Sequence, residues 1–274
     1  MNLTSFSKPK IAILAAFLYT AIMGIGMFYM KTVLGITYGQ PEMMNLFWFI
    51  LIILNALNVF WVIRYFGWQA IGFRRLDRTQ LLWFLPSIAV LIAMWVVCLT
   101  GLSRVSLSAA QWQLFALAGF TTLLVGFGEE IMYRGIVLHA FLTTGRVRWA
   151  MLVSAIAFSL LHAVNVFGGV PLFKVPLQLV MTFLFGFFFA PLMLTLNNIL
   201  PLIIFHGLWD FVVFAAPLAG EQTNAAVGAI GLFNLPIEII VGIVLWLQIK
   251  QVPERAIALR ATKSSADLPK PIDF

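Results

Sequence analysis

The sequence contains very little charge. Asp, Glu, Lys and Arg make up only 10% of its residues, whereas hydrophobic residues make up 62%. A soluble globular domain carries about 25% charged residues, so this chain lacks the polar surface that water requires. No stretch between its apolar runs is long enough for a soluble domain. The composition therefore excludes a soluble enzyme and favours a protein embedded in a lipid bilayer.

Other absences narrow the chemistry. Cys98 is the single cysteine, which excludes an internal disulfide and a Cys-x-x-Cys redox or metal motif. The sequence has no His-Glu-x-x-His and no Gly-x-Ser-x-Gly, so neither a standard zinc helix nor a serine nucleophile elbow is present. We find no internal repeat of the kind that many transporters show.

Basic residues outnumber acidic ones, and the net charge is +7. They lie in short gaps between apolar runs and form no basic face with interleaved aromatic residues, so we expect no nucleic-acid partner. The longest such gap, residues 64–80, alternates aromatic residues with arginines, as expected for a segment lying on an anionic lipid leaflet. The expected partners are the lipid bilayer and a membrane-bound protein or peptide substrate.

Eight apolar runs are long enough to cross a membrane as helices, which requires about 20 mostly apolar residues each. We therefore predict an all-α, polytopic membrane bundle of about eight transmembrane helices, forming a single membrane domain over residues 1–274. Residues 250–274 are expected to form a cytoplasmic tail. The runs lie at residues 11–30, 45–63, 81–102, 111–133, 149–166, 173–195, 198–216 and 227–249.

The positive-inside rule provides a test of this count. With the N-terminus inside and the runs alternating, 14 of the 17 Lys and Arg residues fall on the inside. The three on the outside are Lys31, Arg104 and Lys174. We therefore predict an integral protein of a bacterial plasma membrane, with both termini in the cytoplasm.

Ionisable residues inside a span cost about 2.5–3.5 kcal/mol each and usually mark function. Several occur here in otherwise apolar runs. Run four ends in GFGEEIMYRG, run five contains FSLLHAVN, run seven contains FHGLWD and run eight contains one acid. These residues are Glu129, Glu130, Arg134, His162, Asn165, His206, Asp210 and Glu238.

Their spacing predicts which side chains share a helix face. Glu130 and Arg134 are four residues apart in the order that favours a helical ion pair. Glu129 is turned about 100° away around the helix and is free to face something else. His206 and Asp210 also share a face. We expect all of them to converge on a cavity in the cytoplasmic half of the bilayer.

A cluster of carboxylates and imidazoles can hydrolyse an amide. A carboxylate and an imidazole can share a water and accept its proton, and a second imidazole can stabilise the tetrahedral oxyanion. Alternatively, Glu129, His162 and His206 could bind a divalent metal such as zinc and leave one position open for water. The spacing does not decide between these two mechanisms.

Three motifs in order carry a family resemblance: Glu-Glu-x-x-x-Arg at 129–134, Phe-x-x-x-His at 158–162 and His-x-x-x-Asp at 206–210. The chain resembles the CPBP or Abi family of CAAX-processing and bacteriocin-processing intramembrane proteases, which is related to the prenyl-protein endopeptidase. The resemblance covers about residues 110–215, the helices that would form the catalytic core.

The resemblance implies an eight-helix bundle that cleaves peptide bonds within the membrane, such as those of CAAX-like or leader-type substrates. It implies that Glu129 is the base acting on water with His162 as its partner, supported by Glu130 and Arg134. His206 and Asp210 would form the oxyanion site. Ionised Asp210 cannot donate a hydrogen bond, so we expect it to orient His206. We favour a metal-free mechanism, although the family has long been described as metalloproteases.

Two other functions are compatible with a membrane bundle: a non-catalytic immunity or adaptor protein of the same fold, and a proton-coupled transporter. The intact motif set argues against the first, and the absence of repeats argues against the second. Outside the motifs, we expect His139 to have an interfacial structural role and Glu238 to stabilise a helix kink or an interhelical hydrogen bond. Asn165 is expected to line the cavity or to cap a helix.

Overall fold

A computed structural model describes residues 7–249 of the chain. Within this range the protein is built from α-helices with short 3₁₀ and π turns, and it contains no strand. The predicted cytoplasmic tail at 250–274 lies outside the described residues. The α-helices are α1 (Lys8–Thr32), α2 (Met44–Trp61), α3 (Leu85–Leu102), α4 (Ala109–Glu130), α5 (Leu138–Leu142), α6 (Val147–Leu161), α7 (Val175–Leu196), α8 (Leu200–Ala215), α9 (Glu221–Gly231) and α10 (Asn234–Gln248).

These helices form eight candidate membrane spans within residues 7–249, which confirms the predicted all-α polytopic bundle. Two spans each contain more than one α-helix. The span Ala109–Leu142 joins α4 to α5 through a π-helical turn, and the span Glu221–Gln248 joins α9 to α10. The remaining spans agree with the predicted runs to within a few residues at most ends.

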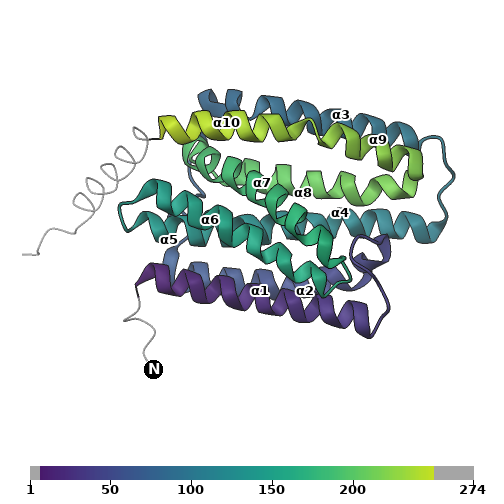
Figure 1. Ribbon diagram of the computed structural model, residues 1–274, viewed down its shortest axis with the longest axis horizontal. Helices are drawn as coiled ribbons and strands as arrows, with labels where there is room; N and C mark the ends of the chain where they lie inside the picture. Colours follow the sequence, from purple (N-terminus) through teal and green to yellow (C-terminus); the bar gives the residue numbers. More distant parts are fainter. Residues whose placement is uncertain (1–6, 250–274) are drawn as a thin grey trace, which may run out of the picture.

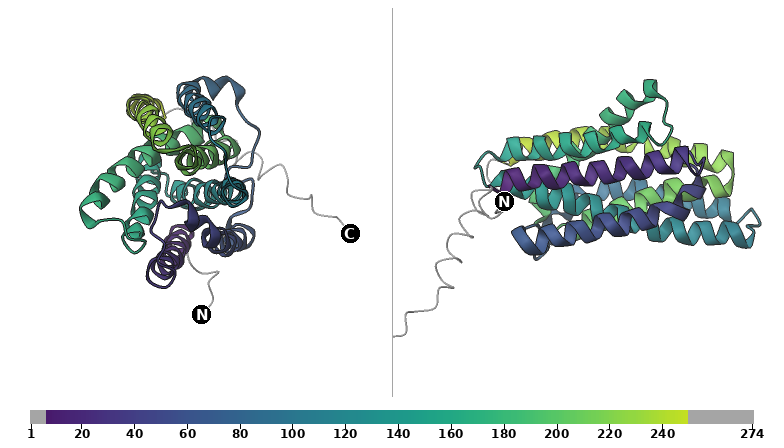
Figure 2. Two further views of the ribbon diagram at one scale, coloured as in Figure 1. Left: turned by 90° about the vertical axis from the view of Figure 1, so that its right-hand side faces the viewer. Right: turned by 90° about the horizontal axis from the view of Figure 1, so that it is seen from below.

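The helices run roughly along the long axis of the molecule, with α1 and α2 on one side and α3, α9 and α10 on the other (Figure 1). Both ends of the described chain lie at the same end of the bundle, as an even number of spans requires (Figures 1 and 2). The centre is formed by α4, which packs against α8 and α2. α6 packs against α7, and α7 against α10.

The burial pattern is that of a membrane protein. Large apolar side chains face outward all round the bundle, including Phe17 at 67% exposure, Ile25 at 69% and Ile240 at 62%. The interior, in contrast, contains polar residues such as Asn58 and Thr121, which are fully buried. Because lipid tails are as apolar as leucine, polar groups in a bilayer are placed inside the protein.

One predicted boundary was wrong. Run four was expected to end at residue 133 and Arg134 was assigned to an inside loop, but the span continues to Leu142 and Arg134 is completely buried. The charge of Arg134 does not mark the end of the helix, because Glu130 pairs with it inside the bundle. Because the helix continues to Leu142, Glu129 and Glu130 lie deeper in the span than the end of run four implies.

The close packing of α4 and α8 depends on two glycines. A Cβ on Gly126 would lie 2.5 Å from the backbone oxygen of Ile203 and 2.7 Å from the backbone nitrogen of Gly207. A Cβ on Gly207 would lie 3.1 Å from the backbone oxygen of Thr122. Small residues let membrane helices approach backbone to backbone. This contact brings the acidic end of α4 beside His206 on α8.

The segment between α2 and α3 folds back onto the turn between α7 and α8. Asp77 N–H donates to Leu196 O at 3.0 Å, and Ile199 N–H donates to Gly72 O at 3.0 Å. Gly72 has a φ of 117°, and a Cβ there would collide with the Met193 side chain, so this close approach requires glycine. The segment therefore fixes the end of the bundle at which α8 begins.

Candidate active site

The buried ion pair between Glu130 and Arg134 is the first element of the site. Arg134 Nη1 lies 2.9 Å from Glu130 Oε1, and both side chains are completely buried. The guanidinium also lies over the ring of Phe158, with 4.1 Å between Cζ and the ring centroid. An arginine is costly in a bilayer unless it is paired, and here a carboxylate and an aromatic face surround it.

The turn that follows Glu130 is a π-helix over Ile131–Val137. Such wide turns leave carbonyls that need other donors, and two side chains provide them. His139 Nδ1 lies 2.9 Å from Arg134 O and 3.0 Å from Gly135 O, and it must donate because carbonyls only accept. Ser154 Oγ donates to Tyr133 O at 2.9 Å. His139 is therefore a buried structural residue, and not an interfacial one as predicted.

His206 is the residue around which the acids gather. Its Nδ1 lies 2.7 Å from Glu130 Oε1, so this nitrogen donates its hydrogen to the carboxylate. Its Nε2 lies 3.8 Å from Glu129 Oε2 and 3.6 Å from Asp210 Oδ2. Three carboxylates from two helices thus surround one imidazole, and Glu130 fixes the orientation of the ring.

His162 lies where α6 ends and a 3₁₀ turn begins. Its Nδ1 donates to Phe158 O at 3.0 Å, which leaves Nε2 of a neutral ring as an acceptor. The Phe158 ring lies 4.9 Å from the His162 ring and 5.9 Å from the His206 ring, between centroids. Phe158 therefore contacts both histidines as well as Arg134.

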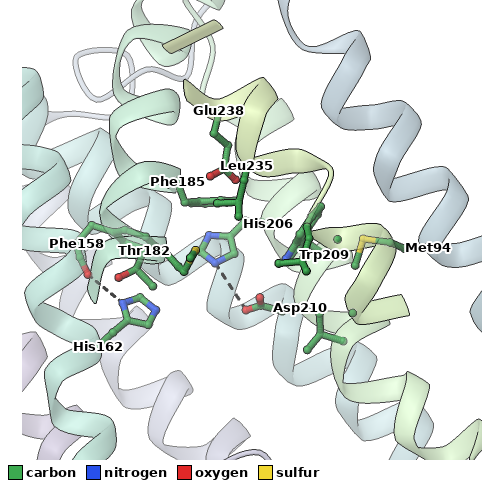
Figure 3. A pocket seen from close by; sticks show the side chains of 15 residues that line it. Met94, Phe158, His162, Thr182, Phe185, His206, Trp209, Asp210, Leu235 and Glu238 are labelled. Carbon is green, nitrogen blue, oxygen red and sulfur yellow. Dashed lines mark hydrogen bonds and ion pairs between the residues drawn. The ribbon is translucent and has the colours of Figure 1, made fainter. Parts of the chain in front are cut away.

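His162, His206 and Asp210 line one cavity of about 320 Å³ (Figure 3). Its walls come from α3, α6, α7, α8, α9 and α10 and are mostly apolar. This volume is at the lower end of the range for small-ligand sites. Glu129 is not among the lining residues and reaches the cavity by way of His206.

Glu129 is buried near the end of α4, beside His206 of α8. Its Oε2 atom has no hydrogen-bond partner within residues 7–249. The preceding residue, Gly128, packs so closely that a Cβ would lie 2.8 Å from the Tyr19 hydroxyl. Asn58 Nδ2 donates to Gly128 O at 2.7 Å. Neighbouring polar groups therefore fix the backbone that carries Glu129.

The structure brings five of the six predicted site residues into direct contact: Glu129, Glu130, Arg134, His206 and Asp210 are joined through ion pairs. The sixth, His162, shares the cavity and packs on Phe158, but no hydrogen bond or ion pair joins it to Glu129 in the described part of the chain. The pairing of Glu129 with His162 through a shared water therefore stays a prediction.

The predicted alternative of a divalent metal at Glu129, His162 and His206 stays a prediction. Across residues 7–249, no group of three or more His, Cys, Asp or Glu side chains has a geometry that could hold a metal ion. Glu129, His162 and His206 do not form such a group, so we derive no catalytic step through a metal.

Asn165 is buried in the 3₁₀ turn that begins at His162. Its backbone oxygen accepts from Gly168 N–H at 3.0 Å, and Gly168 O accepts from Tyr38 N–H, in the loop between α1 and α2, at 2.8 Å. Burial is the main cause that raises the pKa of Tyr38, and the carboxylates of Asp210 and Glu129 add to it. Asn165 is not among the cavity-lining residues, and its role is to connect the end of α6 to this loop.

Several residues that support the site were not predicted from the sequence. Gly126 and Gly207 set the approach of α4 and α8, and Asn55 and Asn58 on α2 donate to carbonyls of α4. A signal for the asparagines was present, because two amides three residues apart are unusual in an apolar run. The glycines gave no such signal, since glycine is frequent in membrane helices.

Comparison with known proteins agrees with the resemblance noted from the motifs. Residues 110–212 match the model of the family described as type II CAAX prenyl endopeptidase Rce1-like. No curated protein and no solved structure matches the chain. The matched segment contains α4, α6, α7 and most of α8, together with Glu129, Glu130, Arg134, His162, His206 and Asp210. Through this segment the chain is similar to the Rce1-like type II CAAX prenyl endopeptidases.

Proposed function

We propose that the protein is an intramembrane endopeptidase that hydrolyses a peptide bond of a membrane-associated protein or peptide. The observation that carries the proposal is the position of His206, held by Glu130 at 2.7 Å and close to Glu129 at 3.8 Å, with its ring at the cavity wall. The family match supports the reaction class.

In the proposed mechanism Glu129 accepts a proton from water, whose oxygen attacks the substrate carbonyl. The new C–O bond gives a tetrahedral oxyanion. With both ring nitrogens protonated, His206 donates from Nε2 to this oxyanion and from Nδ1 to Glu130. The C–N bond then breaks, and the proton held by Glu129 passes to the leaving amine, which balances the hydrolysis.

The other residues position these groups. Asp210, 3.6 Å from His206 Nε2, orients the ring without donating to the oxyanion. Arg134 balances the charge of Glu130 inside the bundle. His162 offers Nε2 as an acceptor at the cavity wall, where it can hold the attacking water or a substrate amide.

The proposed setting is a bacterial plasma membrane, with the arginine-rich end of the bundle facing the cytoplasm. In the described chain, Lys8, Arg74, Arg75, Arg78 and Arg148 belong to segments at the end where α1 and α3 begin. An excess of Lys and Arg marks the cytoplasmic side. His206 lies about one and a half turns into α8 from that end, so cleavage would occur in the cytoplasmic half of the bilayer.

The test is hydrolysis by the purified protein in lipid vesicles. Membrane-tethered peptides should yield two products whose masses sum to that of the substrate plus one water. Glu129→Ala and His162→Ala should leave the peptides intact while keeping the melting temperature of the wild type. Normal cleavage by both variants would show that the proposed function is wrong. If the protein's activity in cells survived replacement of every motif residue, the non-catalytic immunity or adaptor function would be favoured instead.

A further inference from the structure

Glu238 is an acidic residue of the cavity wall that lies outside the family-matched segment. It lies on α10, is 5% exposed, and lines the same cavity as His206 and Asp210. In the view of Figure 3, His206 lies between Glu238 and Asp210. Glu238 therefore faces the space in which a substrate would meet the histidines.

A structural role explains only one of its two carboxylate oxygens. Asn234 Nδ2 donates to Glu238 Oε1 at 2.7 Å, which stabilises the first turn of α10 after the break between α9 and α10. No Lys, Arg or His in residues 7–249 forms an ion pair with Glu238, and its Oε2 has no hydrogen-bond partner there. A carboxylate without a cation in a membrane interior is costly and marks function.

The charges of the cavity indicate which substrate groups fit. Its lining residues include two carboxylates, Asp210 and Glu238, and two imidazoles, but no lysine or arginine. A carboxylate accepts hydrogen bonds and repels a second carboxylate. The wall formed by α10 therefore complements an N–H donor, and it offers no partner to a free C-terminal carboxylate.

We propose that Glu238 is a specificity-determining residue that accepts a hydrogen bond, through Oε2, from an N–H group of the substrate next to the bond that is cleaved. The donor belongs to a lysine or arginine side chain or to a backbone amide. This inference rests on the proposed peptidase function, which requires the substrate carbonyl to lie at His206. Asn234 is the positioning residue that holds the carboxylate toward the cavity.

The first experiment uses the wild-type protein alone. Membrane-tethered peptides that differ at one position beside the cleaved bond carry lysine, norleucine, or an N-methylated backbone amide. Loss of the recognised donor should lower kcat/KM about tenfold to a hundredfold, as expected for a hydrogen bond to a charged group. A norleucine effect identifies a side-chain donor, and an N-methyl effect identifies a backbone donor. Equal rates for all peptides, at every position scanned, would overturn the proposal.

The second experiment assigns the preference to Glu238. Glu238→Gln keeps an oxygen for Asn234 but removes the charge, so the preference ratio should fall toward one. Glu221→Gln, a matched change at an exposed acid on α9, should keep the wild-type ratio. A folded Glu238→Gln protein with the wild-type ratio would contradict the inference while the peptidase function stands. If the wild type cleaves no peptide at all, the proposed function itself fails and the inference fails with it.

Discussion

The span Ala109–Leu142 and the span Glu221–Gln248 differ in hydropathy and in burial. In a soluble protein the more hydrophobic helix would be the more buried one, and here the order is the opposite. The first has the lower mean hydropathy, 1.5 against 2.1, yet 56% of its most apolar stretch is buried in the protein, against 28% for the second. The less hydrophobic helix is the central one. Its acids, glycines and threonines face neighbouring helices, whereas side chains such as Ile240 and Leu247 on α10 face outward.

This difference shows what drives the arrangement of the bundle. Apolar helices gain little by leaving lipid for the protein interior, so their packing is weakly specified. A helix with charges must instead place them against partners, and Glu130, Arg134 and His206 supply these for one another. The same interactions that position α4 also assemble the candidate site, so stability and function should be sensitive to the same residues.

The largest expected effect comes from breaking the central ion pair. Arg134→Met leaves Glu130 buried without its cation and should lower the free energy of unfolding by about 3–5 kcal/mol. Arg104→Met, at an exposed position after α3, should change it by less than about 0.5 kcal/mol. Thermal unfolding in detergent measures both. Equal stability of the two variants would contradict the distinction between the central and the peripheral spans.

A smaller effect is expected from the contact between α4 and α8. Gly126→Ala places a Cβ 2.5 Å from Ile203 O, so α8 must shift at a cost of about 1–3 kcal/mol. Peptide cleavage should also fall, because His206 moves with α8. Gly228→Ala on α9 is the matched control for stability, since a Cβ there meets no atom within 4 Å. A stable and active Gly126→Ala protein would show that this contact does not position the site.

The smallest effect is expected between α2 and α4. Asn58→Ala removes the buried hydrogen bond to Gly128 O and should cost about 0.6–2 kcal/mol, the range for interhelical hydrogen bonds in membranes. Asn45→Ala, at an exposed position near the start of α2, should leave unfolding unchanged. If the two substitutions have the same effect, the amide of Asn58 does not hold the backbone beside Glu129.

Much of the fold could be predicted from hydropathy and charge, because a span needs a fixed length and the basic residues gather at one end. The end of run four could not be predicted in this way. Arg134 looks like the start of a loop until Glu130, Phe158 and the π turn are known to surround it. A hydropathy scale scores an arginine as polar wherever it lies. It takes no account of a carboxylate on the same or another helix that pairs with the arginine inside the bundle.

The candidate site was predictable to the level of its residue types and their order along the chain. The sequence could not predict that His206 lies beside Glu129, because this depends on the approach of two helix backbones at Gly126 and Gly207. The position of Glu238 in the cavity likewise depends on the break between α9 and α10. Tertiary packing decides both, and no local pattern encodes it.

The most direct test of the account is the rate of peptide hydrolysis by Glu129→Gln, measured in vesicles beside Glu221→Gln. Both substitutions replace one glutamate by its amide, but only Glu129 lies beside His206. We predict that Glu129→Gln lowers kcat by about 10²- to 10⁴-fold, the usual contribution of a general base, while Glu221→Gln keeps the wild-type rate. Equal rates for the two folded variants would contradict the central claim that Glu129 activates water for cleavage within the membrane.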